Sequence, residues 1–551
     1  MRERRPGPAE KRNPSAPSSY IKQASLLAGA GILVRIIGFL YRLPLTNMIG
    51  NEGMGIYAIG YNVYNFFLIL SSAGLPAAIS KLVAERFSLG HYREGRQVFR
   101  VALILAWCGG LACCVALGFG ADFFAETLGS PRSSLTIITL APTTLIVAIA
   151  AVFRGYFQGQ QNTAPSAISQ VLEQIVNAVG SVALAWQLML ITGATPGADV
   201  IAAGAAGGTL GTGVGAAFGL AVLIWIYILF RPRERELLAA DTTGTRPFNS
   251  AGIALRIVRT AAPIIIGTAI FSIANLIDTF MTTNRLVDGA GMSEAEATAL
   301  FGILNGKYVT LTTLPITIST SFASAAIPGV SASVAQGRTK EAHRRINTAI
   351  RMAMLLSVPA AVGLGVLAEP ILSLLFPKYP EGADLLRIGS VSVVFLALTQ
   401  ISTGVLQGVG RLRGPVVGAA IGVLVKIPIS WLLLGIPQVN IIGAVIGTIA
   451  CYMAAAAFDV AYLIRTTHAR IDFMKILVKP AIASVVMGMA CFVSYFLVQT
   501  ALGINALSIA VSVTLGVAVY FAFMALLGGL EREDVARFPF GDRIARAIFR
   551  K

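Results

Sequence analysis

Charged residues are scarce in this 551-residue sequence, because Asp, Glu, Lys and Arg together make up only 13% of it. Hydrophobic residues make up 56%, and the mean hydropathy is +0.75. A soluble protein cannot bury so large an apolar fraction, and here the apolar residues form runs long enough to cross a bilayer. The composition therefore excludes a soluble protein and predicts an all-α polytopic membrane protein.

Residues that commonly carry enzymatic or metal chemistry are scarce as well. The three histidines have no second ligand at metal spacing, and the five cysteines show neither zinc nor disulfide-framework spacing. The sequence has no nucleotide-binding loop, and its carboxylates form no pair typical of a glycosyltransferase. We therefore expect no enzyme and no cofactor, with Na⁺ or a proton as the candidate coupling ion for transport.

Fourteen apolar segments follow a basic tail at residues 1–23, which we expect to be disordered. Each segment is long enough to form a transmembrane helix. Their approximate bounds are 24–46, 55–78, 98–120, 134–153, 166–190, 201–230, 256–281, 299–326, 347–368, 386–407, 415–435, 441–464, 476–499 and 503–529.

The distribution of the 43 lysines and arginines tests this count. The tails and even-numbered connections, with the span ends that adjoin them, hold 35; the odd-numbered connections hold four, and four lie within spans. Because basic residues concentrate on the cytoplasmic side, this split predicts that both termini are cytoplasmic. The net charge of +17 then reflects topology and not nucleic-acid binding. We expect the basic tail 530–551 to lie on the anionic inner leaflet.

An internal repeat divides the chain. The stretch that begins at Gly90 resembles the stretch that begins at Gly337, at an offset of 247 residues, and two further matches lie near the same offset. Six spans separate the copies, so both have the same orientation, which predicts a pseudo-two-fold axis along the membrane normal. We expect two six-helix halves, 24–230 and 256–464, a cytoplasmic linker, 231–255, and an appended helix pair within 465–529.

The first apolar segment carries two arginines, Arg35 near its centre and Arg42 seven residues later. Two helical turns separate them, which places both on one face about 10 Å apart. A charge at that depth costs several kcal/mol unless it faces a wet cavity or a partner. We therefore expect this helix to line a polar pathway, with Arg35 binding substrate near mid-membrane and Arg42 acting as a gate nearer the outer face.

The run RIIGFLYRLPLTNMIGNEGMGIY from Arg35 and the run SAGLPAAISKLVAE from Ser72 resemble the amino-terminal signature of SpoVB/MurJ-type polysaccharide biosynthesis proteins. These belong to the multidrug/oligosaccharidyl-lipid/polysaccharide exporter (MOP) superfamily. The six-six-two span pattern and GILNGKY at 302–308 fit the same resemblance. It implies a flippase for undecaprenyl-diphosphate-linked saccharides, most often lipid II. It carries a substrate role to Arg35 only, since the sequence departs from the family pattern at Tyr41 and Arg42.

Four other basic residues are candidates for binding the diphosphate of such a substrate, because cationic donors suit phosphate oxygens. Lys81 and Arg154 lie at the cytoplasmic ends of spans, where they would either capture the substrate or simply snorkel to the membrane surface. Lys307, next to Asn305, and Lys426 lie inside spans and are expected to face the cavity.

Acidic residues within spans are candidates for coupling or charge balance. Glu173, Asp278 and Asp459 would each bind a coupling Na⁺ or proton, or neutralise an arginine. Glu173 is also counted among the substrate-binding candidates. Asp278 and Arg42 lie near the outer ends of corresponding spans, which predicts pairing or gating between them, and Asn275 lies one turn before Asp278 on the same face.

The leading hypothesis is a lipid-linked saccharide flippase that works by alternating access. Arg35, assisted by Arg42 and Lys81, would bind the diphosphate between the halves, and the lipid tail would lie near the appended helices. Two alternatives stay open: a cation-coupled multidrug exporter, and a non-transporting scaffold of a cell-wall or sporulation complex. The expected partners are the lipid-linked substrate, membrane lipids and cell-wall synthesis proteins, with no nucleic acid.

Overall fold

The computed structural model describes residues 16–241, 250–324, 327–411, 413–469 and 471–529, and every regular element in these ranges is a helix. In chain order the elements are α1 (Ala16–Leu40), α2 (Arg42–Ser72), α3 (Leu75–Ser88), α4 (Tyr92–Phe119), α5 (Ala121–Thr127), the 3₁₀-helix η1 (Pro131–Ser133), α6 (Ser134–Gly159), α7 (Ala164–Gly193), α8 (Val200–Ala240), α9 (Ser250–Asp288), α10 (Glu294–Ile303), the π-helix η2 (Leu304–Val309), α11 (Thr310–Ser324), α12 (Ile327–Ala335), α13 (Thr339–Val366), α14 (Ala368–Leu375), α15 (Ala383–Gly389), α16 (Ser392–Gly408), α17 (Arg413–Leu434), α18 (Ile442–Thr467), the π-helix η3 (Met474–Val478), α19 (Lys479–Leu502) and α20 (Asn505–Leu526). The tails predicted at 1–23 and 530–551, except residues 16–23, lie outside the described residues.

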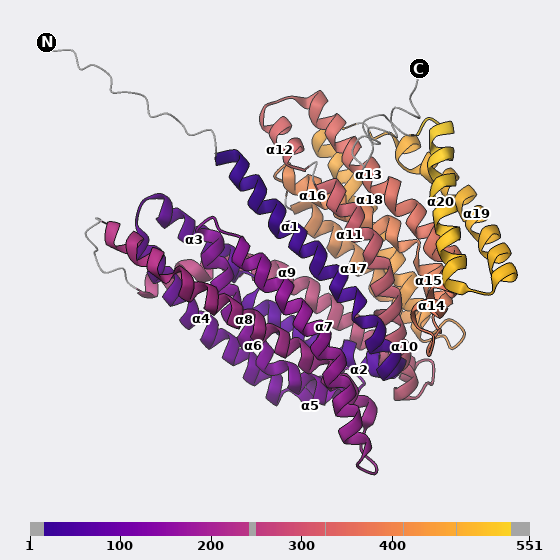
Figure 1. Cartoon of the computed structure of the whole chain (residues 1–551). Coiled ribbons are helices and arrows are strands. Elements are labelled where there is room, and N and C mark those ends of the chain that lie inside the picture. Colours follow the sequence, from indigo (N-terminus) through magenta and orange to yellow (C-terminus); the bar gives the residue numbers. More distant parts are fainter. Residues whose placement is uncertain (1–15, 242–249, 325–326, 412, 470, 530–551) are drawn as a thin grey trace.

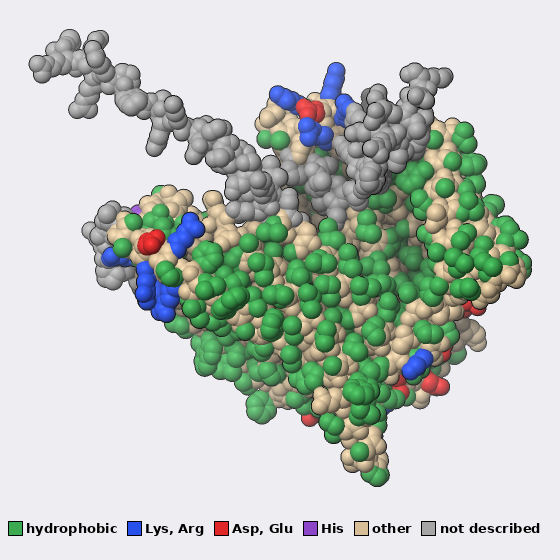
Figure 2. Space-filling view, in the orientation of Figure 1, with side chains coloured by type: hydrophobic (Ala, Val, Ile, Leu, Met, Phe, Trp, Pro, Cys, Tyr) green, Lys and Arg blue, Asp and Glu red, His purple; other side chains and the backbone are tan. Residues whose placement is uncertain are grey.

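By length and hydropathy, eleven of the described helices could cross a membrane, or twelve if α15 and α16, bent by 46°, form one span. The predicted count of fourteen is therefore not confirmed. Two of the expected spans are not among these helices. In the first, Gly29–Leu40 counts only as a short apolar helix, and the eighth is divided among α10, η2 and α11. Hydrophobic side chains cover the broad middle of the molecule, and charged side chains gather towards its two ends (Figure 2).

The first helix does not stop between its two arginines. Tyr41 has helical dihedral angles, and its amide donates to the Ile37 carbonyl at 3.1 Å, so the helical path continues from α1 into α2. The break comes at Gly50, where φ is +75° and ψ is −177°, a conformation that only glycine adopts without strain. Arg35 and Arg42 therefore share one helical path, as their spacing predicts.

Helices α1–α8, the first half, and α10–α18 form two bundles that lie side by side, with α19 and α20 at the outer edge of the second (Figure 1). Each bundle has an apolar core of its own, and α19 and α20 pack on α13 through a third. α1 begins and α20 ends at the same end of the molecule, which we call the terminal end. The opposite end, where the loops at 128–131 and 376–382 lie, is the distal end.

Helix α9 joins the two bundles. Its residues Ile253 and Ile257 are buried in the core of the first half, whereas Leu286 is buried in a distal cluster that contains residues from both bundles. Gly74, just before α3, lets α9 approach closely, because a Cβ at this position would lie 2.6 Å from the Ala261 carbonyl oxygen of α9. The terminal part of α9 thus packs on the half that precedes it in the sequence.

Contacts between the bundles close the distal end. The Asn47 side chain donates to the Leu375 carbonyl at 2.8 Å, and the Asn51 side chain donates to the Glu381 carboxylate at 2.9 Å. Thr283 on α9 donates to the Leu128 carbonyl at 2.7 Å. These hydrogen bonds would have to break for the two bundles to separate at this end.

The crossing of α2 and α10 depends on glycine, since a Cβ at Gly55 would lie 1.9 Å from the Thr298 carbonyl oxygen. We expect Gly55→Ala to force these helices apart at a cost of about 1–3 kcal/mol, the usual range for overpacking. Amide hydrogen exchange in α2 and α10 of the purified protein should become roughly tenfold faster or more. Gly109→Ala, at a position with no neighbouring atom within 4 Å, is the matched control. Unchanged exchange in Gly55→Ala would contradict the proposed role of this crossing.

Candidate functional site

Two threonines of α11 meet the two arginines of the first helical path. Arg35 donates to Thr317 Oγ1 at 3.4 Å, and Arg42 donates to Thr310 Oγ1 at 3.2 Å. Thr310 and Thr317 are also seven residues apart, so the two arginine–threonine contacts lie about two helical turns apart along α1–α2 and α11. The arginines of the first half therefore lie where the two bundles meet.

The surroundings of the two arginines differ. Arg35 is exposed and makes only the long contact to Thr317 among the described residues, so most of its five N–H donors are available to a ligand. Arg42 is half-buried beside a cluster of tyrosines, in which the hydroxyls of Tyr41 and Tyr57 lie 3.2 Å apart and the rings of Tyr57 and Tyr61 stack at 5.9 Å. Arg35 is thus the better placed of the two to bind an anion.

Arg154 and Glu173 form an ion pair inside the first half. Arg154 Nη2 on α6 lies 2.5 Å from Glu173 Oε2 on α7, and Arg154 Nε donates to Ser169 at 3.4 Å. The Arg154 side chain is 12% exposed and the Glu173 side chain 26%. Each charge is therefore balanced by the other.

Asp278 pairs with Lys426, which corrects the predicted pairing of Asp278 with Arg42. Asp278 Oδ1 on α9 lies 2.7 Å from Lys426 Nζ on α17. Both side chains line a cavity of about 360 Å³ in the second bundle, together with Asn275, Gln400 and further residues of α9, α16, α17 and α18. Lys426 lines this cavity, where its charge is met by an acidic partner within the protein.

The depth of Lys307 in its span predicts that it faces the cavity, but the structure buries it against a loop. It is 1% exposed, and its ammonium donates to the carbonyls of Tyr379 at 2.5 Å and Glu381 at 2.9 Å. Lys307 and Asn305 belong to the π-helix η2, a geometry that is frequent at functional sites. The Asn305 side chain donates to the Phe301 carbonyl at 3.2 Å. Lys307 thus holds the distal loop, next to the contacts that close that end.

Glu381 is the acidic residue of this loop. Partial burial raises the pKa of its carboxyl group, but the hydrogen bond from Asn51 and the nearby Lys307 ammonium outweigh that effect, so the pKa lies below its ordinary value. The carboxylate therefore stays charged at neutral pH. Its contribution to the closed distal end would weaken only as the pH falls through that lowered pKa.

The remaining candidates lie apart from one another. Lys81, on α3 near the terminal end, is exposed and has no hydrogen-bond or ion-pair partner among the described residues. Asp459 on α18 is fully buried; Thr403 donates to its Oδ2 at 3.3 Å, whereas Oδ1 has no partner in the described part of the chain. Neither an arginine nor a lysine of those ranges neutralises Asp459.

A second, apolar cavity of about 910 Å³ lies between α13, α16 and the appended helix α19. Val362 and Val366 line one wall, Met489 and Phe492 the other, and Arg387 and Ser390 contribute polar atoms. This is the part of the molecule where the sequence places a groove for a lipid tail.

The contact threonines Thr310 and Thr317 are functional candidates that the sequence did not single out. Their spacing of seven, which matches that of Arg35 and Arg42, is the signal that could have found them. Threonine is ordinary in a transmembrane helix, so the spacing becomes informative only once α1 and α11 are known to be neighbours.

Comparison with known proteins identifies the family. The family described as "Polysaccharide biosynthesis protein" matches residues 20–334, more than half of the chain, and MatE matches residues 263–432. The chain belongs to the polysaccharide biosynthesis protein family. The chain is 29% identical to the lipid II flippase MurJ of Bacillus subtilis over 550 residues, which cover 95% of this chain and 98% of that protein. It is 26% identical to stage V sporulation protein B of the same organism, over 97% and 100% of the two chains.

Solved structures share the fold of this family member. A lipid II flippase MurJ in an inward closed conformation superposes with a TM-score of 0.66 at 13% identity, covering 91% of this chain and 98% of that one. An inward-facing multidrug resistance MATE transporter of the MOP superfamily also gives a TM-score of 0.66, at 15% identity and over 79% and 95% of the chains. The protein is therefore a multi-pass membrane protein with the fold of MOP transporters and flippases, which are not enzymes.

Proposed function

We propose that this protein is a flippase that moves an undecaprenyl-diphosphate-linked saccharide of the lipid II type from the inner to the outer leaflet. The observation that carries the proposal is the placement of Arg35 and Arg42. They belong to the first half, contact α11 of the second, and leave Arg35 exposed at the junction. A diphosphate needs such cationic donors, and bidentate arginine matches its oxygens.

Alternating access requires the junction to open to each side in turn. In the proposed cycle Arg35 binds the diphosphate while the distal contacts of Asn47 and Asn51 are closed. Breaking those contacts then exposes the head group to the distal side. The lipid tail, too long to enter the junction, would stay in the apolar cavity between α13, α16 and α19.

Orientation and energy source belong to the same proposal. The concentration of lysine and arginine at the terminal end supports cytoplasmic termini, so the distal end faces outward. Membrane potential or a Na⁺ or proton gradient would drive turnover. The buried carboxylate of Asp459 and the Asp278–Lys426 pair are the acidic sites through which a cation would act. Cell-wall synthesis proteins are the expected partners that use the product.

The substrate is tested by depleting the protein in its host and measuring lipid-linked saccharides on each leaflet. We expect one undecaprenyl-diphosphate-linked species to accumulate on the inner leaflet, and that species is the substrate. Unchanged amounts on both leaflets, in a strain without a second flippase of this family, would contradict the proposal and favour a scaffold.

A cation-coupled multidrug exporter is the second candidate, supported by the MatE match over residues 263–432 and the MATE-like fold. The exposed Arg35 argues against it, because a cationic drug would be repelled by an arginine at the junction of the halves. Drug-sensitivity profiles of the depleted strain separate the two: an exporter predicts sensitisation to cationic compounds, a flippase does not.

A further inference from the structure

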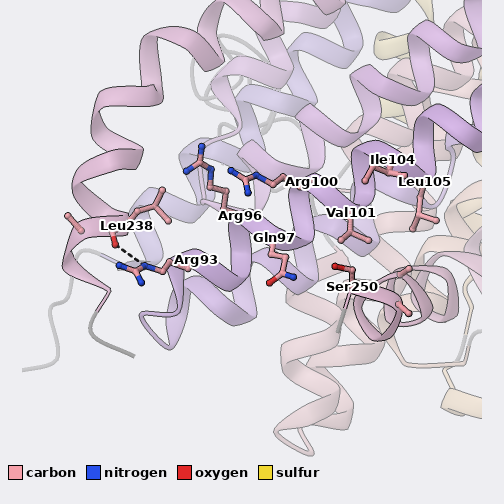
Figure 3. A pocket seen from close by; sticks show the side chains of 12 residues that line it. Arg93, Arg96, Gln97, Arg100, Val101, Ile104, Leu105, Leu238 and Ser250 are labelled. Atoms are coloured by element: carbon pink, nitrogen blue, oxygen red, sulfur yellow. Dashed lines mark hydrogen bonds between the residues drawn. The ribbon is translucent and has the colours of Figure 1, made fainter. Parts of the chain in front are cut away.

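A cavity of about 880 Å³ lies at the terminal end of the first half, away from the junction of the two bundles. One wall is α4, and the others are the end of α8 and the first turns of α9, as Figure 3 shows. The lining residues are Arg93, Arg96, Gln97, Arg100, Val101, Ile104, Leu105, Leu238, Ala239, Ser250, Ala251 and Ala254.

Three arginines make the mouth of this cavity basic. Arg93, Arg96 and Arg100 are three and four residues apart, a spacing that puts them on one face of α4. Arg93 Nε donates to the Leu238 carbonyl at 3.4 Å. Arg96 Nε lies 3.8 Å from Glu234, too far for a hydrogen bond. Arg100 is exposed and has no partner among the described residues, so the mouth retains positive charge that a ligand could meet.

Two acidic groups nearby offset part of this charge. The Glu234 carboxylate accepts from Tyr156 at 2.6 Å and from Tyr227 at 3.3 Å, and its long ion pair with Arg96 balances one guanidinium. The Asp241 carboxylate accepts from the backbone amide of Arg93 at 2.9 Å. Three guanidiniums therefore face two carboxylates, and the positive charge that is left over includes that of the exposed Arg100.

The character of α4 changes from basic to apolar within two turns. Val101, Ile104 and Leu105 follow Arg100 along the same wall, and the Ile104 side chain is 64% exposed. Figure 3 shows the arginines towards one end of this wall and the apolar side chains towards the other. An anionic head group with an acyl chain attached matches this succession, whereas a free anion would leave the apolar part unused.

The internal repeat provides a comparison within the chain. At the offset of 247 residues, Arg96 corresponds to His343 and Arg100 to Asn347, both on α13. There the His343 ring bonds to the Thr467 carbonyl at 2.7 Å, and the Asn347 side chain accepts from the Asp472 amide at 3.4 Å. The second copy thus uses these positions to bind the protein's own chain, whereas the first copy places arginines at an open cavity.

We propose that this cavity binds an anionic glycerophospholipid of the leaflet at the terminal end, with its phosphate on Arg96 and Arg100 and an acyl chain along Ile104 and Leu105. One wall is α4, and the facing wall is α9, the helix that joins the two bundles. A bound lipid therefore favours the arrangement in which α9 packs on the first half. This inference is independent of which lipid the protein transports, because the cavity does not contain Arg35 or Arg42.

The test measures binding of phosphatidylglycerol to the purified full-length protein, with phosphatidylcholine as the zwitterionic comparison. Arg96 and Arg100 would each donate charge-assisted hydrogen bonds to the lipid phosphate, so Arg96→Gln/Arg100→Gln should weaken binding roughly 30-fold or more. The control Arg338→Gln/Lys340→Gln removes two exposed charges of the second bundle that do not line the cavity and should change binding less than about twofold. Thermal unfolding of each variant checks that it folds.

A second variant separates the cavity from general charge attraction. Ala254→Trp keeps all three arginines but fills space in the α9 wall, so it should weaken phosphatidylglycerol binding roughly tenfold or more, by steric exclusion. Inorganic phosphate at millimolar concentration should not displace the lipid. Wild-type affinity in either cavity variant, an equal loss in the control, or full displacement by phosphate would each overturn the proposal. If the double variant fails to fold, Arg100→Gln and Ala254→Trp decide the matter.

Discussion

Arg35→Ala is expected to reduce translocation roughly 100-fold or more while the protein stays in the membrane. The side chain is exposed and makes one long hydrogen bond, so its removal costs little folding free energy. It removes charge-assisted hydrogen bonds to the substrate diphosphate that are worth about 1.5–3 kcal/mol each. Complementation of a depleted strain, with the amount of membrane-inserted protein measured in parallel, checks this result.

Two further variants control for charge and position. Arg35→Lys keeps the positive charge but loses the bidentate geometry, so we expect partial activity. Arg338→Ala removes an exposed arginine away from the junction and should complement fully. Full growth of the Arg35→Ala strain would mean that Arg35 does not bind the substrate, even if the family and fold assignments stand.

Lys426→Met is expected to destabilise the protein by about 2–4 kcal/mol, because it leaves the Asp278 carboxylate without its partner inside a helical bundle. The estimate lies below that for a fully buried pair, since the two side chains are 18% and 25% exposed. Asp278→Asn should have a similar effect. The double variant Asp278→Asn/Lys426→Met removes both charges and should regain most of the lost stability in thermal unfolding of the purified protein.

Transport by the double variant separates two roles of the pair. If the pair only balances charge, the double variant regains both stability and transport. If Asp278 binds a coupling cation, stability returns while transport stays low. A double variant as unstable as the single ones would show that the two charges do not interact. The exposed pair Arg338 and Glu341, whose charged atoms lie 3.6 Å apart, is the control, and breaking it should change stability little.

Local features of the sequence carried most of what could be predicted of the fold. Long apolar runs specify helices, the offset of 247 residues between Gly90 and Gly337 predicts two related halves, and a spacing of seven puts Arg35 and Arg42 on one face. Where the type of helix changes within a span, sequence is a weaker guide. The eighth expected span contains the π-helix η2, and its apolar run does not reveal that change.

Partners far apart in the chain were harder to predict. Asp278 and Arg42 occupy corresponding spans of the repeat, but correspondence between halves does not make two residues neighbours. Asp278 in fact meets Lys426, 148 residues away on α17. Lys307 is deep within its span, yet it contacts carbonyls of the loop near Tyr379, and depth alone cannot distinguish such internal bonds from a cavity. These pairings depend on helix rotation and tilt, which packing sets and hydropathy does not encode.

The most direct test of the proposed flippase is translocation by the purified protein in proteoliposomes that contain an undecaprenyl-diphosphate-linked saccharide in the inner leaflet. With a membrane potential or ion gradient imposed, the proposal predicts that the saccharide becomes accessible to an external modifying enzyme, and that Arg35→Ala proteoliposomes show only the rate of protein-free vesicles. Accessibility that stays at the protein-free rate with the wild-type protein, for every lipid-linked saccharide supplied, would contradict it.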